Sequence, residues 1–215
     1  FNNKSLFLAA GKKVFGWFDF ENNLNSGNYS FDINTSSIGS INFSSLRGVA
    51  YNGEFFALGE TDNKNIYIWK GIPGLNDEPD YIIQNPVGVG RIDMNEEWLV
   101  VSAYPGAGSP VHVINLTNLD SGIMLPVPGN DDFPQGVSIN EKGFFIALQG
   151  SNKVVGWSSV QDALNGSSPT MSFGGTTNKT NSGTKMASTV HWDGFHLWVG
   201  AVSYTHLTLP TSYAV

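Results

Sequence analysis

The strongest constraint on the fold is a short module that occurs four times along the chain. Each copy has an apolar strand, a polar turn and a second apolar strand, which is the pattern of a β-hairpin. Two of the turns contain Asn52-Gly53 and Asp193-Gly194, dipeptides that favour tight hairpin turns because positive φ costs little there. The copies span residues 48–58, 88–101, 136–148 and 189–199.

Two further strands are predicted after the hairpins, and the spacing identifies the architecture. The third strands are predicted at 14–17, 66–69, 111–114 and 154–157, and weaker fourth strands at 29–33, 81–84, 123–126 and 171–173. The hairpins start 40, 48 and 53 residues apart. Four strands in each period of about 40–50 residues are typical of a propeller blade, whereas a β-sandwich would not repeat its hairpin at this interval. No segment of ten or more residues has the apolar period of a helix.

The predicted fold is therefore all-β: a partial β-propeller of about four blades, built from four-stranded antiparallel sheets, whose ring is not closed. The domain is expected to span residues 1–201. Residues 5–10 read as a second strand without its first partner, so the chain is expected to begin and end inside a blade. The blades are predicted near 5–45, 46–87, 88–135 and 136–187, with the start of another at 188–200.

The C-terminal residues are expected to be foreign to the protein. Residues 202–211 resemble a translated sequencing adapter, and the flanking Ala201 and Ser212 permit the codons that this reading needs. The alternative is a genuine threonine-rich strand. We expect residues 202–215 to be a non-native tail and exclude them from the interpretation of the fold.

The repeat resembles the NHL-repeat propellers at residues 60–69, 133–138 and 149–157, where a Gly-Val lead-in, an Asn-containing turn and an apolar strand recur. The resemblance covers residues 5 to about 200 and implies a six-bladed ring, of which about a third would be missing. It departs from the family at Asn65 and Lys153, which replace the family's arginine, and around 104–110, where the Asn pair is absent. It supports the superfamily and no particular activity.

Composition excludes several classes of function. The 215 residues are 40% apolar and 13% aromatic, enough for a packed core. The net charge of −7 argues against nucleic acid as a partner, and the absence of cysteine excludes disulfides and thiolate metal sites. No apolar run is long enough for a membrane span, and no cofactor, nucleophile-elbow or phosphate-loop motif occurs. Few lysines and no cysteine suit an exported protein.

Four residues form the candidate ligand-binding set. Arg47 and Gln135 each precede the glycine that opens a first strand, and Val87 and Ser188 hold that place in the other copies. In propellers the loop leading into this strand lies near the channel mouth, where ligands dock. Arg47 is one of two arginines and suits a carboxylate or phosphate, although a solvated loop or a bond between blades is the alternative. The full set is Arg47, Tyr104, Asp131 and Gln135.

Other chemically active residues are not assigned to a metal or carbohydrate site; the tryptophans and histidines are expected to be structural and the loop acids solvated. Recurrence favours packing between blades over carbohydrate stacking for the tryptophans, because a ligand site needs asymmetry. The histidines share no ligand-like spacing with a carboxylate, and the loop acids form no repeated calcium cage. The tryptophans are Trp17, Trp69 and Trp157, the histidines are His112, His191 and His196, and the loop acids lie at residues 77–80 and 131–132.

The predicted function is a non-catalytic propeller module that binds a protein, peptide or glycan at its loop-bearing face, because no set of catalytic residues converges. One alternative is a fragment of a calcium-dependent propeller hydrolase, lactonase or lyase whose site lies partly outside this chain. The other is a structural repeat of a cell-surface protein. No cofactor is expected, and no catalytic or metal residue is assigned.

Overall fold

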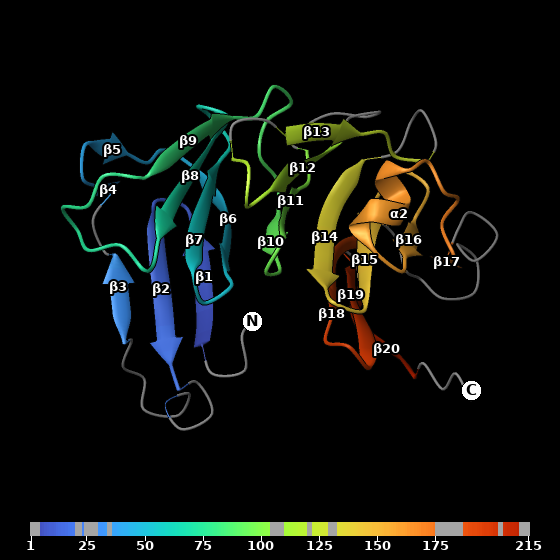
Figure 1. Cartoon of the computed structure of the whole chain (residues 1–215). Coiled ribbons are helices and arrows are strands. Elements are labelled where there is room, and N and C mark those ends of the chain that lie inside the picture. The colour runs from blue at the N-terminus through green and yellow to red at the C-terminus, as the bar shows by residue number, and fades with distance from the viewer. Residues whose placement is uncertain are drawn as a thin grey trace.

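A computed structural model describes residues 5–19, 23, 30–33, 36–103, 110–119, 122–128, 133–174, 187–201 and 204–210. In Figure 1 the sheets follow one another in chain order along an arc, from the blue N-terminal sheet through green to the red C-terminal sheet. Neighbouring sheets meet through the innermost described strand of each sheet, and no described strand joins the first sheet to the last. The described residues therefore form part of a β-propeller whose ring is open.

Three sheets are complete four-stranded antiparallel blades with strands in sequential order. The first contains β6 (Leu46–Tyr51), β7 (Phe55–Glu60), β8 (Asn65–Lys70) and β9 (Tyr81–Gln84). The second contains β10 (Ile92–Met94), β11 (Trp98–Val101), β12 (Val111–Asn115) and β13 (Gly122–Leu125). The third contains β14 (Pro134–Asn140), β15 (Gly143–Leu148), β16 (Lys153–Trp157) and β17 (Met171–Gly174).

The outermost sheets of the arc have three described strands each. The N-terminal sheet contains β1 (Ser5–Ala10), β2 (Lys13–Phe18) and β3 (Phe31–Ile33), and a small hairpin of β4 (Ser37–Ile38) and β5 (Ile41–Asn42) follows it. The C-terminal sheet contains β18 (Ala187–Trp192), β19 (His196–Ala201) and β20 (Tyr204–Pro210). The backbone of β20 pairs with β19, although β20 lies in the expected foreign tail; this pairing does not bear on the origin of those residues.

The hairpins form where the repeated module predicts them, but the turn uses different chemistry. In the Asn52-Gly53 and Asp193-Gly194 turns, only the glycine of each pair has positive φ, 104° at Gly53 and 95° at Gly194. Asn52 instead uses its side chain: its Oδ1 accepts hydrogen bonds from the backbone N–H groups of Glu54 at 2.9 Å and Phe55 at 2.7 Å. Such an Asx turn needs an oxygen on a short side chain, which explains why Asn or Asp begins each hairpin turn.

The core lies between the sheets rather than in one centre. Each hydrophobic cluster joins side chains from two neighbouring sheets. Trp69 and Trp157 are buried in these clusters, and their indole N–H groups donate to the carbonyl oxygens of Asp77 at 3.2 Å and Ser167 at 2.8 Å. Trp17 is partly buried at the equivalent place in the N-terminal sheet. The two buried tryptophans have the packing role that their recurrence predicts.

One short helix, α2 (Val160–Leu164), connects β16 to β17 and was not predicted. Five residues are too few to show a helical period. Ser159 caps the helix, its Oγ accepting a hydrogen bond from Asp162 N–H at 3.1 Å. The Ser-x-x-Asp spacing is the local signal that could have indicated it. Over the described residues, no helix is long and apolar enough to cross a membrane.

Candidate functional site at the first strands

A pocket of about 580 Å³ lies where the first strands of the sheets meet, in the place of a propeller's central channel. The three complete blades and the two outermost sheets all contribute residues to its lining, so the pocket exists only because the repeats are arranged around it. The described lining includes Phe7, Tyr51, Asp93, Val137 and Val190. Concave sites with an apolar wall and a few polar groups are the usual form of a ligand site.

Two of the predicted site residues, Arg47 and Gln135, are not in the pocket lining but occupy equivalent irregular positions in strands that line it. The antiparallel register shifts at Arg47 in β6 and at Gln135 in β14, so each is the extra residue of a β-bulge. Ser188 is the extra residue in β18. Bulges redirect side chains and are frequent beside functional sites. We call this end of the first strands the bulge end, and the end with the Asx turns the turn end.

The structure corrects the alignment of the second copy of the hairpin, at residues 88–101. Matching Gly88 with Gly48 places Val87 at the bulge position, which is wrong. The Asx turn of this blade begins at Asn95, whose Oδ1 accepts from Trp98 N–H at 2.8 Å, so Asn95 is the equivalent of Asn52. Counting back from the turns makes Gly90 the equivalent of the bulge residues, and Arg91 the equivalent of Gly48. The sequence contains this signal, because Asn95 lies in the polar turn between the two apolar strands of this copy.

The corrected register reveals two functional candidates that the sequence interpretation missed, Arg91 and Ser102. The Nη1 atom of Arg91 donates to the carbonyl oxygen of Arg47 at 3.2 Å. The backbone N–H of Arg91 donates to Ser102 Oγ at 2.7 Å, and Ser102 Oγ donates to the carbonyl oxygen of Gln135 at 3.0 Å. A continuous polar chain therefore joins three blades at the bulge end and includes both predicted residues that the structure describes there.

The other two predicted ligand residues, Tyr104 and Asp131, lie outside the described residues. Their roles therefore stay predictions. Arg47 and Gln135 are both half-buried. Each takes part in the polar chain between blades through its backbone carbonyl oxygen.

In the middle of the first strands, acceptors on one blade bind the backbone of the next. Asp93 Oδ2 accepts from Ile139 N–H at 2.9 Å, and Ser138 Oγ accepts from Trp192 N–H at 2.9 Å. Burial raises the pKa of Asp93, which outweighs the opposing hydrogen bond from Ile139 and the nearby charge of His191. Asp93 Oδ1 also accepts from Met94 N–H at 3.0 Å. Both carboxylate oxygens therefore have backbone partners.

The turn end carries a second set of bonds between blades. Asn52 Nδ2 donates to the carbonyl oxygen of Asn95 at 2.9 Å, and Asn140 Nδ2 donates to that of Trp192 at 2.9 Å. Each asparagine thus forms its own turn through the oxygen and holds the next blade through the nitrogen. Asp193 has the equivalent position in the last sheet, and a carboxylate cannot donate in this way.

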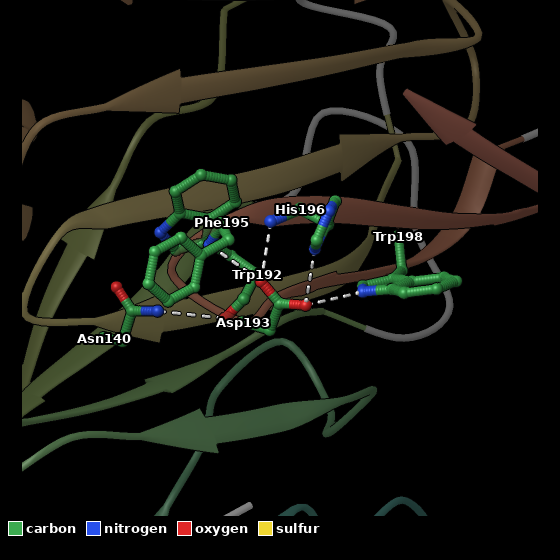
Figure 2. Close-up of polar contacts among 6 residues, drawn as sticks. All are labelled: Asn140, Trp192, Asp193, Phe195, His196 and Trp198. Atoms are coloured by element: carbon green, nitrogen blue, oxygen red, sulfur yellow. Dashed lines mark hydrogen bonds and ion pairs between the residues drawn. The ribbon is translucent and has the colours of Figure 1, made fainter. Parts of the chain in front are cut away.

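Figure 2 shows Asp193 at the centre of a polar cluster in the last sheet. Its Oδ2 accepts from Trp198 Nε1 at 3.0 Å and lies 3.3 Å from His196 Nδ1, while Oδ1 accepts from the N–H groups of Phe195 and His196. Slight burial raises the pKa of Asp193, but these hydrogen bonds together hold it well below its usual value. The sequence interpretation found no carboxylate at a ligand-like spacing from the histidines, but Asp193, three residues before His196, contacts its ring.

This cluster belongs to a face that neighbouring sheets cover elsewhere. Trp198 lies five residues after Asp193 and is 41% exposed, whereas the residue five positions after Asn140, Phe145, is 1% exposed. Phe145 packs against Trp192 of the following sheet with ring centroids 5.2 Å apart. Trp198 therefore lies on a packing face of the fold, and its exposure does not by itself indicate a ligand platform.

The predicted metal candidates have other partners. In the loop at 77–80, Asp77 Oδ2 accepts from Gly74 N–H at 2.8 Å, Glu78 accepts from Ser40 and Asp80 Oδ2 accepts from Lys70 N–H at 2.7 Å. These acids fix loops rather than only facing solvent. Within the ranges that the structure describes, no group of three or more histidine, aspartate or glutamate side chains could hold a metal ion.

His112 is buried in a different place, beside a pocket of about 480 Å³ between β9 and β13. Its side chain is 4% exposed, and its Nδ1 atom has no hydrogen-bond partner among the described residues. Burial lowers the pKa of His112. The prediction of a structural histidine agrees with this packing, but the orphaned nitrogen was not expected.

Comparisons with known proteins support the fold. No protein-family model matches the sequence, and no curated protein is significantly similar to it. The structure is similar to the β-propeller domain of Cps50 (Swd1) from Myceliophteria thermophila, with a TM-score of 0.60, 9% identity, and coverage of 92% of this chain and 65% of that domain. It is also similar to U3-55K, with a TM-score of 0.58, 13% identity, and coverage of 91% of this chain and 56% of the other.

A computationally designed protein, Ika4, provides a third comparison, with a TM-score of 0.56, 11% identity, and coverage of 80% of this chain and 94% of the other. The chain thus spans less than two thirds of the length of the two natural proteins. Identities this low establish the β-propeller fold alone.

Proposed function

We propose that this chain is a non-catalytic β-propeller module that binds a protein, peptide or glycan at the bulge end of its first strands. The observation that carries the proposal is the polar chain from Arg47 through Arg91 and Ser102 to Gln135, beside the central pocket. Side chains at this end differ from blade to blade, as recognition of one ligand requires, while the backbone bonds that support them are fixed.

The acids of the described pocket favour binding over catalysis. A general base needs a carboxylate free to take a proton from the substrate. Asp93 accepts backbone hydrogen bonds at both oxygens. Asp193 accepts two from backbone N–H groups and one from Trp198 Nε1, and His196 Nδ1 lies 3.3 Å from its Oδ2. These groups support the fold and present fixed charge. The NHL-type repeat, the six-bladed ring and the calcium-dependent enzyme stay predictions.

Binding arrays with a matched pair of variants test the proposal. The intact protein is applied to peptide and glycan arrays, and partners are then titrated against Gln135→Ala and Glu141→Ala. Both residues belong to the same hairpin, but Gln135 lies at the bulge end and Glu141 in the exposed turn. We expect Gln135→Ala to weaken binding and Glu141→Ala to leave it unchanged. The backbone carbonyl of residue 135, which accepts from Ser102, is retained in the variant, so the loss would come from the side chain and not from a change of fold.

Two results would overturn the proposal. One is equal loss of affinity in both variants, which would move the contact away from the bulge end. The other is turnover of an ester or lactone that a calcium chelator abolishes, with no partner on either array. That result would favour the enzyme instead.

A further inference from the structure

The two arginines of the chain meet at one site, although 44 residues separate them in the sequence. Arg91 reaches back across the blade interface, and its Nη1 donates to the carbonyl oxygen of Arg47 at 3.2 Å. Arg91 also lines the central pocket. In a chain with a net charge of −7, two arginines in contact at the bulge end, one of which lines the pocket, are an unusual local concentration of positive charge.

The protein holds the Arg91 backbone firmly on both sides. Its N–H donates to Ser102 Oγ at 2.7 Å, and its carbonyl oxygen accepts from Ser102 N–H at 2.8 Å. Ser102 is fully buried, so this support is rigid. A guanidinium group has five N–H donors, and the bond to Arg47 uses one of them. Donors remain for a ligand that enters the pocket.

The acids near Arg91 are occupied elsewhere. Asp93, two residues along the same strand, accepts from Met94 and Ile139. Over the part of the chain that the structure describes, the one ion pair within 4.0 Å joins His196 to Asp193, so Arg91 has no carboxylate partner there. Burial and the neighbouring charge of Arg47 both lower the pKa of Arg91, yet a guanidinium remains protonated in proteins. Two like charges are thus held together without a described counter-charge on Arg91.

We infer that Arg47 and Arg91 together bind an oxyanion, a carboxylate or phosphate group carried by the ligand of the central pocket. The inference rests on the proposed function and names the chemistry of its ligand. A planar or tetrahedral oxyanion accepts several N–H bonds from paired guanidinium groups and reduces the repulsion between them. Arginine suits this role better than lysine because its donors form a fixed fork.

The presence of only two arginines gives a direct measurement. The arginine Nε–H region of the ¹⁵N-edited NMR spectrum of the intact protein should contain two signals, which Arg47→Lys and Arg91→Lys assign. Sodium phosphate is titrated in one series and sodium acetate in a second, with sodium chloride keeping the ionic strength constant. The two series separate phosphate from carboxylate chemistry.

We expect both signals to follow one saturable curve with a dissociation constant of roughly millimolar order in at least one series, as one charge-assisted contact provides. Arg91→Gln should weaken binding about tenfold or more. It should still fold, because Ser102 contacts only the Arg91 backbone. Lys142→Gln, which removes an exposed cation at the turn end, should leave the curve unchanged.

Linear, non-saturating shifts in both series would overturn the inference, as would saturation that Arg91→Gln does not alter. Failure of the two proposals is distinguishable. Saturable phosphate or acetate binding without a partner on the arrays would leave the arginine site standing and remove the binding-module proposal. An array partner whose binding is weakened by Gln135→Ala but not by Arg91→Gln would support the binding module and overturn the arginine site.

Discussion

The two ends of the first strands are built from the same repeat but follow different rules. At the turn end, Asn52 and Asn140 make the same two bonds, one within their own hairpin and one to the next blade. At the bulge end the equivalent side chains are Arg47, Gln135 and Ser188, which share no chemistry. A contact that recurs in successive blades serves the fold, whereas variation on a fixed backbone position leaves room for a ligand.

The sharpest test separates backbone from side chain at the bulge end. A Cβ atom on Gly136 would lie 2.8 Å from Thr189 Cα and 3.0 Å from the Ser188 carbonyl oxygen. These are backbone atoms of the next blade and have little freedom to move. We expect Gly136→Ala to lower the free energy of unfolding by about 2–3 kcal/mol, measured by urea denaturation. A cost near zero would mean that the first strands are not tightly packed at this end.

The next largest effect is expected at the turn end. Asn140→Ala removes the acceptor for Lys142 N–H and the donor to the Trp192 carbonyl oxygen, and should cost about 1–2 kcal/mol. Asn140→Asp keeps the acceptor and loses only the donor, so it should cost less than the alanine variant. Urea midpoints of the two variants measure the difference. Equal costs would show that the turn oxygen contributes nothing, contrary to its recurrence.

The dependence of stability on pH should be determined by a residue at neither end of the first strands, His112, which lies between β9 and β13. The pKa of His112 is lowered by burial, so the unfolded chain binds more protons in the window below about pH 6.5. Stability should therefore fall as the pH drops through that window. Asp93 has a raised pKa, so the folded state takes up its proton first and the effect has the opposite sign.

We expect His112→Phe, which keeps a flat ring beside Gly122, to reduce the loss of stability between pH 7 and pH 5. Thermal melting at the two pH values measures it. An unchanged loss in this variant would place the acid-sensitive group elsewhere than at His112.

The sequence predicted the strands well because their signals are local. The fourth strand predicted at 81–84 is β9 (Tyr81–Gln84), since alternating apolar residues bounded by turns specify one strand regardless of the rest. The site was predicted only in part. Arg47 and Gln135 were found from their positions before glycines, but the contact between Arg91 and Arg47 depends on the register of two blades 44 residues apart.

That register was lost by aligning the hairpins on Gly88 instead of Asn95. Glycine tolerates many backbone positions, whereas an Asx turn requires a side-chain oxygen at one place. Asn95 is therefore the better marker of the repeat. Aligning every copy on its Asn or Asp turn places Arg91 next to the Arg47 position from the amino-acid sequence alone.

The smallest effect on stability is expected from Gln135→Ala. This variant tests whether side chains at the bulge end serve recognition or the fold. Ser102 Oγ donates to the Gln135 carbonyl oxygen, so the substitution removes only a half-buried side chain and leaves the bond between blades. The free energy of unfolding should change by less than about 0.5 kcal/mol in urea denaturation. A loss as large as that of Asn140→Ala would make Gln135 a structural residue and remove the distinction between the two ends. A stable variant that no longer binds its partner would separate recognition from folding at a single residue.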